Sequence, residues 1–139
     1  DNFSPYRVHQ RCAPTFRVDR VLLAGDAAHA TNPCGGLGLT GGVIDADALS
    51  DTLGAVIAGR ADERVLDFYS TERRRVFLEV TSPMSTNFKR LLSEKDPKQR
   101  AKDKAGMFAE AERGGADVRA SSLAELIKGA AMPVEPLPA

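Results

Sequence analysis

The fold of this chain is decided by the stretch VLLAGDAAHATNPCGGLGLTGG, residues 21–42. Its first four residues, Val21 to Ala24, are all apolar and predict a short strand that is covered on both faces. Gly25 then permits a sharp turn, and Asp26 places a carboxylate at the carboxyl end of the strand. Ligands bind at this edge in open α/β sheets. The stretch therefore predicts a strand, a turn and a ligand-binding edge.

The second half of the stretch is rich in glycine. Residues 36–41 formally match G-x-G-x-x-G, but the dinucleotide fingerprint places its first glycine directly after a strand, and here a ten-residue segment intervenes. A Walker loop is less well supported still, because no lysine follows the last glycines. What the glycines do permit is a close approach of the backbone to a ligand, with the first N–H groups of the next helix aimed at it.

On either side of this stretch, the patterns predict few strands and several helices. A loosely alternating segment at residues 6–13 predicts a second strand. Beyond the glycine loop, apolar residues recur at helical spacing, first at Val43, Ala46, Leu49, Leu53, Val56 and Ile57, and then at Val65, Leu66, Tyr69, Val76, Phe77 and Val80. Gly59 is expected to end the first of these helices and Asp62-Glu63 to begin the second. Pro83 is expected to kink or interrupt the second helix.

The carboxyl-terminal third of the chain predicts a helical extension. Asp96-Pro97 is a favourable helix start, and Gly114-Gly115 would end that helix. A further short helix is expected at 123–128, and residues 132–139 have the composition of an irregular tail. We therefore divide the chain into residues 1–95, which contain the motifs, and residues 96–139, a helical extension with a tail.

Bulk properties restrict the class of protein. The 139 residues include 19 basic and 19 acidic side chains, so no net charge attracts nucleic acid. No apolar run approaches the roughly 20 residues that span a bilayer, and the amino terminus lacks a signal-peptide pattern. Two isolated cysteines, Cys12 and Cys34, fit a reducing compartment and predict a cytoplasmic protein. The chain begins at Asp1 without a methionine, which suggests a fragment of a longer protein.

Each polar residue of interest also has an ordinary structural interpretation. Asp26 alone is as readily a turn residue as a ligand-binding one. His29 has no second metal ligand at suitable spacing, so a structural role is favoured and no metal site is expected. Consecutive arginines, Arg73 to Arg75, fan around a helix, and a solvated face is the default expectation for them. No residue is singled out as catalytic.

The combination of these motifs resembles one family. The order Gly25-Asp26-Ala27-Ala28-His29, Pro33, Gly35-Gly36-Leu37-Gly38-Leu39 and Asp45-Ala46 is similar to the second flavin-binding motif of the FAD-dependent aromatic hydroxylases, the single-component flavoprotein monooxygenases related to p-hydroxybenzoate hydroxylase. The resemblance extends over about the first 90 residues. It implies an α/β fold class, with this chain as a mostly helical, carboxyl-terminal fragment of a Rossmann-like FAD-binding fold that has about two short strands.

The resemblance also implies roles for individual residues. Asp26 would accept hydrogen bonds from the ribityl chain of FAD, and Pro33 would lie beside the isoalloxazine ring. The backbone from Gly36 to Thr40 would face the pyrimidine edge of the ring, where a helix amino terminus stabilises negative charge. The complete cofactor-binding set expected is Gly25, Asp26, Pro33, Gly35, Gly36, Gly38, Leu39 and Thr40. Many relatives carry asparagine where Thr40 stands, so a side-chain amide contact is lost at this position.

By resemblance, the parent protein is an NAD(P)H-dependent FAD monooxygenase. NADPH or NADH would reduce the flavin, molecular oxygen would form a flavin hydroperoxide, and this would hydroxylate a small aromatic substrate. Members of the family begin with a strand, a G-x-G-x-x-G turn and a helix that bind the ADP half of FAD, and later have a substrate sheet; this chain has neither. Two alternatives stay open: a flavin halogenase, epoxidase or oxidase of the same fold, and a non-catalytic fragment that retains the motif.

Overall fold

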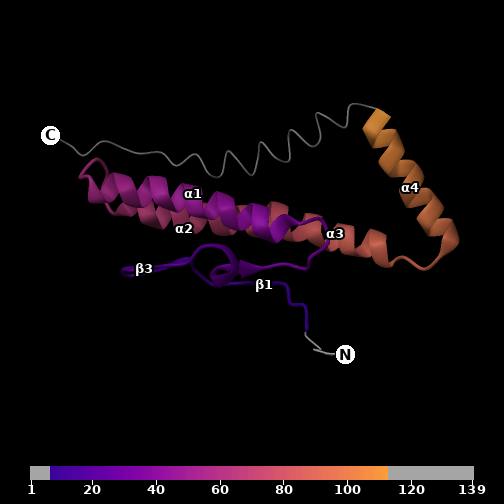
Figure 1. Cartoon of the computed structure of the whole chain (residues 1–139), viewed down its shortest axis with the longest axis horizontal. Helices are drawn as coiled ribbons and strands as arrows, with labels where there is room; N and C mark the ends of the chain where they lie inside the picture. Colours follow the sequence, from indigo (N-terminus) through magenta and orange to yellow (C-terminus); the bar gives the residue numbers. More distant parts are fainter. Residues whose placement is uncertain (1–6, 113–139) are drawn as a thin grey trace, which may run out of the picture.

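The computed structural model describes residues 7–112 as two small antiparallel sheets beside a set of helices (Figure 1). The strands are β1 (Arg11–Cys12), β2 (Arg17–Val18), β3 (Val21–Leu22) and β4 (His29–Ala30). The helices are α1 (Leu37–Ile57), α2 (Arg64–Val76), α3 (Ser82–Ser93) and α4 (Pro97–Glu112), with a 3-10 turn η1 (Gly25–Ala27) and a π-helical segment η2 (Phe77–Thr81). Helices α1 and α2 lie side by side, the strands flank them, and α4 turns away at an angle (Figure 1).

Both predicted strands are present, but they are shorter than expected and pair with partners that the sequence did not indicate. The strand predicted at 6–13 is β1, which pairs with β4. The strand predicted from Val21 to Ala24 is β3, which pairs with β2 in a hairpin. The expectation that it is covered on both faces is wrong for this chain, because Val21 is 63% exposed. A two-stranded hairpin packs only one face on the helices, and Leu22 occupies that face.

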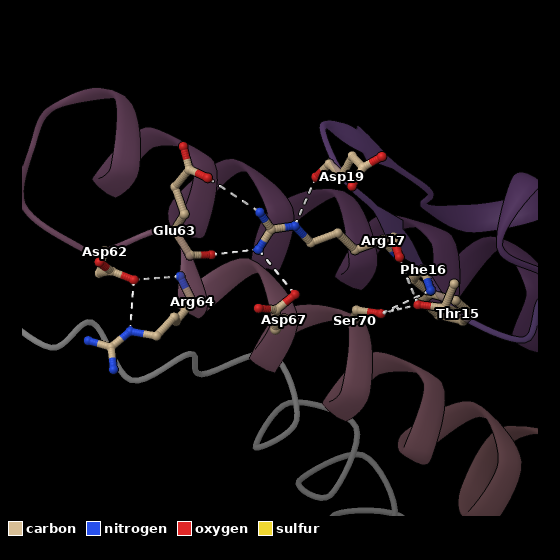
Figure 2. Close-up of polar contacts among 9 residues, drawn as sticks. All are labelled: Thr15, Phe16, Arg17, Asp19, Asp62, Glu63, Arg64, Asp67 and Ser70. Atoms are coloured by element: carbon tan, nitrogen blue, oxygen red, sulfur yellow. Dashed lines mark hydrogen bonds and ion pairs between the residues drawn. The ribbon is translucent and has the colours of Figure 1, made fainter.

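A close-up shows how this hairpin is fastened to α2 (Figure 2). The Arg17 guanidinium donates to the backbone carbonyl of Glu63 at 2.7 Å and pairs with the Asp67 carboxylate at 3.1 Å. One helical turn further on, the Ser70 hydroxyl accepts a hydrogen bond from the Phe16 N–H at 2.9 Å. These contacts hold β2, which precedes residues 21–42, against the first half of α2.

The helical boundaries largely follow the predicted stop and start signals. Gly59 adopts a left-handed φ of 65° just after α1 ends, as expected. The Asp62 carboxylate accepts a hydrogen bond from the Arg64 N–H at 2.9 Å, which caps the start of α2. Asp96 caps α4 in the same way, through the Lys98 N–H at 3.0 Å. The expected helix end at 114–115, the helix at 123–128 and the tail lie outside the described residues.

Pro83 interrupts the regular hydrogen-bond ladder without ending the helix. The chain is helical from α2 through η2 to α3, and the π-helical segment ends at Thr81, two residues before the proline. Proline has no N–H to donate to the preceding turn and its ring crowds that turn, so a wider turn accommodates it. Arg90 on α3 pairs with Asp103 on α4 at 3.0 Å, which links these two helices.

The core corrects the predicted face of α1. Phe16, Ala28, Ala48 and Tyr69 form one buried cluster, and Ala55, Ala61, Val65 and Leu66 form another. The buried positions of α1 are Gly41, Asp45, Ala48, Thr52 and Ala55, whereas Val43 and Ile57, which were predicted to be in the core, are 60% and 78% exposed. Small residues fill the α1 face because it packs closely on α2 and the strands. Of the apolar set predicted for the second helix, Val65, Leu66, Tyr69, Val76 and Phe77 are buried, and Val80 is half-buried.

Within residues 7–112, no helix is both long enough and apolar enough to cross a membrane.

Candidate functional site

The Gly25–Asp26 turn presents a carboxylate at the molecular surface. Gly25 has a left-handed φ of 58°, which a residue without a Cβ adopts at little cost. Its carbonyl accepts a hydrogen bond from the Ala28 N–H at 2.8 Å, which closes the turn. Asp26 follows in the middle of η1 and is exposed. The predicted carboxylate is therefore presented outward by a rigid turn.

The turn lies directly against the beginning of α1. A Cβ atom built on Gly42 would be 3.3 Å from the Gly25 Cα atom, so a side chain at Gly42 would press the helix away from the turn. Glycine at both positions lets the turn and the helix meet backbone to backbone. The structure thus brings together Asp26 and the glycine segment, as the sequence predicted.

Helix α1 begins within the glycine segment, six residues before the Val43 from which its apolar pattern was read. Gly36 has a left-handed φ of 67° and stands as the residue before the helix, so Gly38, Leu39 and Thr40 are in the first turn. The first four N–H groups of a helix have no partner within it. Leu39 is 80% exposed, so the first turn lies at an open surface, and Gly42 in the next turn of the helix contacts Gly25.

The Thr40 hydroxyl is engaged locally. It donates to the Gly36 carbonyl at 3.3 Å, as threonine side chains do within helices. This contact does not use the Thr40 N–H. The role predicted for Thr40 through its backbone is therefore compatible with the structure.

The loop before α1 is held by residues that the sequence analysis did not identify. Asn32 is 3% exposed; its side-chain amide donates to the Ser85 carbonyl at 3.1 Å, and its Oδ1 accepts from the Cys34 N–H at 3.0 Å. The Phe88 ring packs so closely on Gly35 that a Cβ there would be 2.5 Å from the ring. Pro33, Gly35 and Gly36 remain exposed. An asparagine before proline is a turn signal, but its partners on α3 are too distant in sequence to infer.

A buried charged cluster lies behind the site. The Asp45 carboxylate accepts hydrogen bonds from His29 Nε2 at 2.6 Å, from Arg73 Nε at 2.8 Å and from the Gly25 N–H at 3.0 Å. Asp45, His29 and Arg73 are 0%, 4% and 2% exposed. Burial acts to raise the pKa of Asp45, but the hydrogen bonds from His29 and Arg73 outweigh it and hold the pKa below its ordinary value.

This cluster decides the interpretation of two sequence features. The structural role expected for His29 is confirmed, because its ring stacks on Phe77 with centroids 4.5 Å apart and bonds Asp45. The solvated face expected for the three arginines holds only in part for Arg75, which is half-buried and pairs with Glu72 and Glu79. Arg74 is half-buried and donates to the Ala13 carbonyl, and the expectation is wrong for Arg73. Arg73 is on the α2 face that packs against α1, where Asp45 supplies its counter-charge.

Comparison with known proteins identifies the family. The family described as "FAD binding domain" matches residues 1–83. The chain belongs to this FAD-binding family. It is 60% identical over 111 residues to para-nitrophenol 4-monooxygenase from Pseudomonas sp. (strain WBC-3), a match that covers 80% of this chain and 27% of the relative. It is 50% identical over 95 residues to 6-hydroxy-3-succinoylpyridine 3-monooxygenase from Pseudomonas putida (strain DSM 28022 / S16), covering 68% of this chain and 24% of the relative.

A solved structure supports the same assignment. The crystal structure of p-nitrophenol 4-monooxygenase from Pseudomonas putida DLL-E4 superposes with a TM-score of 0.77 and 54% identity, over 91% of this chain and 32% of that chain. The chain therefore spans about a quarter to a third of the length of these relatives. The predicted membership of the FAD-dependent aromatic hydroxylases and the predicted mostly helical fold are both confirmed.

The site residues fit a flavin nucleotide. An exposed carboxylate can accept hydrogen bonds from sugar-alcohol hydroxyls, and the adjacent helix amino terminus offers N–H donors and a positive dipole end to an electron-rich ring edge. The close contact of Gly25 with Gly42 keeps these two features side by side.

Proposed function

We propose that this chain is the flavin-contacting, carboxyl-terminal segment of a longer NAD(P)H-dependent FAD monooxygenase that hydroxylates a small aromatic substrate; we call this longer protein the full-length enzyme. The observation that carries the proposal is the contact between the turn that presents the exposed Asp26 carboxylate and the amino-terminal part of α1, where Gly25 meets Gly42. The monooxygenase names of the relatives support the reaction type.

Within the proposed site, the described residues bind and orient the cofactor. Asp26 accepts hydrogen bonds from the ribityl hydroxyls, and Pro33 lies beside the isoalloxazine ring. The backbone N–H groups from Gly36 to Thr40 face the pyrimidine edge, where the helix dipole stabilises negative charge. FAD, when bound, supplies the redox chemistry by taking electrons from NADPH or NADH and activating molecular oxygen. We further propose a cytoplasmic location, which the two free cysteines, Cys12 and Cys34, support.

A chimera tests the proposal. The matching 111-residue segment of para-nitrophenol 4-monooxygenase from Pseudomonas sp. (strain WBC-3) is replaced by the aligned residues of this chain, with which it is 60% identical. We expect the purified chimera to be yellow, to show a flavin absorption spectrum and to oxidise NADPH or NADH when para-nitrophenol is added. The unaltered relative is the control. A folded chimera without flavin would overturn the proposal, and flavin retention without oxidation would overturn its catalytic part.

A further inference from the structure

We propose that Asp45 is a positioning residue for flavin binding. Through its hydrogen bond to the Gly25 N–H, it fixes the orientation in which the turn presents the Asp26 carboxylate. The inference rests on the proposed function of Asp26, but it concerns a side chain that is fully buried and does not reach the ligand surface.

The composition of the cluster favours a role in fixing geometry. Asp45, His29 and Arg73 are all more than nine-tenths buried, and removing charges from water is costly. Well-packed apolar residues of similar volume often give equal or greater stability, so a buried ion pair is weak evidence for a stabilising role. A role in specifying one geometry accounts for the polar groups, because hydrogen bonds have a direction and apolar contacts do not.

The hydrogen bonds of the Asp45 carboxylate connect it to the turn that carries Asp26. One carboxylate oxygen, Oδ2, accepts from both the Gly25 N–H and His29 Nε2, while Oδ1 accepts from Arg73 Nε. The Gly25 N–H belongs to the peptide group immediately before the left-handed residue, and Asp26 follows directly. Fixing that peptide plane, together with the hydrogen bond from the Ala28 N–H to the Gly25 carbonyl that closes the turn, fixes the direction in which the Asp26 Cα–Cβ bond leaves the turn.

The surroundings keep the Asp45 side chain from moving. His29 is stacked on Phe77 with centroids 4.5 Å apart, and a Cβ atom on Gly41 would be 3.3 Å from its Cε1 atom. Arg73 approaches from α2 on the other side of the carboxylate. Within residues 7–112, three separate elements thus converge on one carboxylate, and the only backbone group among its partners there is the N–H beside Asp26.

Asparagine at this position cannot reproduce the pattern. If its carbonyl oxygen faces Gly25 and His29, its amide NH₂ faces the Arg73 Nε–H, donor against donor. If the amide is flipped, the oxygen serves Arg73 and the Gly25 N–H loses its acceptor. In either orientation, one of the hydrogen bonds that the carboxylate accepts is lost. Asp45→Asn therefore tests the geometry with almost no change in volume.

The experiment is a double-mutant cycle on FAD affinity in the full-length enzyme, measured by equilibrium flavin titration of the apoprotein. It compares the unaltered enzyme with Asp26→Ala, Asp45→Asn and the double variant. We expect Asp45→Asn to weaken FAD binding about tenfold. We expect the double variant to bind no more weakly than Asp26→Ala, because Asp45 acts through Asp26. The matched control is Asp47→Asn on the exposed side of α1, which should bind FAD normally.

Each outcome decides between the hypotheses. Additive losses in the double variant, or an Asp45→Asn affinity equal to that of the unaltered enzyme, would overturn this inference. Unchanged affinity in Asp26→Ala would instead overturn the proposed function. If Asp45→Asn does not fold, Asp45→Glu is used in the same cycle, since it keeps the charge beside Arg73 but moves both oxygens by one methylene. Asp45→Glu should also weaken FAD binding, and its combination with Asp26→Ala should bind FAD no more weakly than Asp26→Ala alone. Additive losses in that combination would overturn the inference.

Discussion

Asp26 stands alone at the tip of its turn, and its carboxylate makes no hydrogen bond or ion pair with other residues in the described range 7–112. Its acceptors are therefore available to a ligand. We predict that Asp26→Ala in the full-length enzyme weakens FAD binding by about 1 to 3 kcal/mol, because the ribityl hydroxyls lose an acceptor in a closed site. Flavin titration of both forms measures the loss. Equal affinities would show that Asp26 is only a turn residue.

The buried Asp45 carboxylate makes the stability of the folded protein depend on pH. Its pKa lies below the ordinary value in the folded protein, so the folded state binds fewer protons than the unfolded state. The stabilisation is therefore fully present above about pH 4 and is lost as the pH falls through the folded-state pKa. We predict that Asp45→Asn lowers stability by about 3 to 5 kcal/mol at pH 7, since it removes the carboxylate that pairs with the buried Arg73 guanidinium at 2.8 Å.

Thermal unfolding of the full-length enzyme at a series of pH values checks this prediction. The difference in melting temperature between the unaltered enzyme and Asp45→Asn should narrow as the pH falls below about 4. Exposed carboxylates such as Asp62, whose pKa is also lowered, by hydrogen bonds from Arg64, are present in both proteins and cancel in the comparison. A difference that is constant with pH would mean that Asp45 is not ionised in the folded state.

At the scale of elements, the contact between η1 and α1 gives two glycines of α1, Gly42 and Gly54, different roles. A Cβ on Gly42 would be 3.3 Å from the Gly25 backbone, whereas a Cβ on Gly54 would meet nothing within 4 Å. We predict that Gly54→Ala stabilises the full-length enzyme by about 0.5 to 1 kcal/mol, because alanine loses less backbone entropy in a helix. Gly42→Ala should forfeit that gain and weaken FAD binding, since it displaces the turn. Thermal unfolding and flavin titration of the pair measure both effects.

The elements also show which sequence signals are reliable. Helix ends at Gly59 and starts at Asp62 and Asp96 were predictable because capping depends on residues next to each other in the chain. The buried face of α1 was not, because tertiary contact selected its small and polar residues over Val43 and Ile57. One signal was present in the sequence: Asp45 falls in register with Gly41, Ala48, Thr52 and Ala55 at helical spacing.

At the scale of the whole molecule, the sequence predicts the residues of the motif more accurately than the residues that pack behind the motif. The order of Gly25, Asp26 and the glycine segment specified the family, and the structure places them together. The residues that support them have partners far away in the sequence: Arg73 bonds Asp45 across 28 positions, and Asn32 bonds Ser85 and Phe88 packs on Gly35 across 53 positions. No local pattern indicates these distant partners. The roles of the cofactor-contacting residues and the division into residues 1–95 and 96–139 stay predictions.

The distribution of apolar surface leads to a prediction for the 139-residue chain alone. Val18, Val21, Leu39, Val43 and Ile57 are each at least 60% exposed, on the hairpin and on the outer face of α1. Such surface is normally covered by neighbouring elements, so we predict marginal folding cooperativity for the isolated chain. FAD must also give up about 4 to 15 kcal/mol of translational and orientational freedom on binding, and the described residues provide only one side of the proposed site. We therefore predict neither tight FAD binding nor turnover, measured by flavin fluorescence quenching and by NADPH or NADH oxidation. Submicromolar binding accompanied by turnover would show instead that these residues form a complete flavoenzyme.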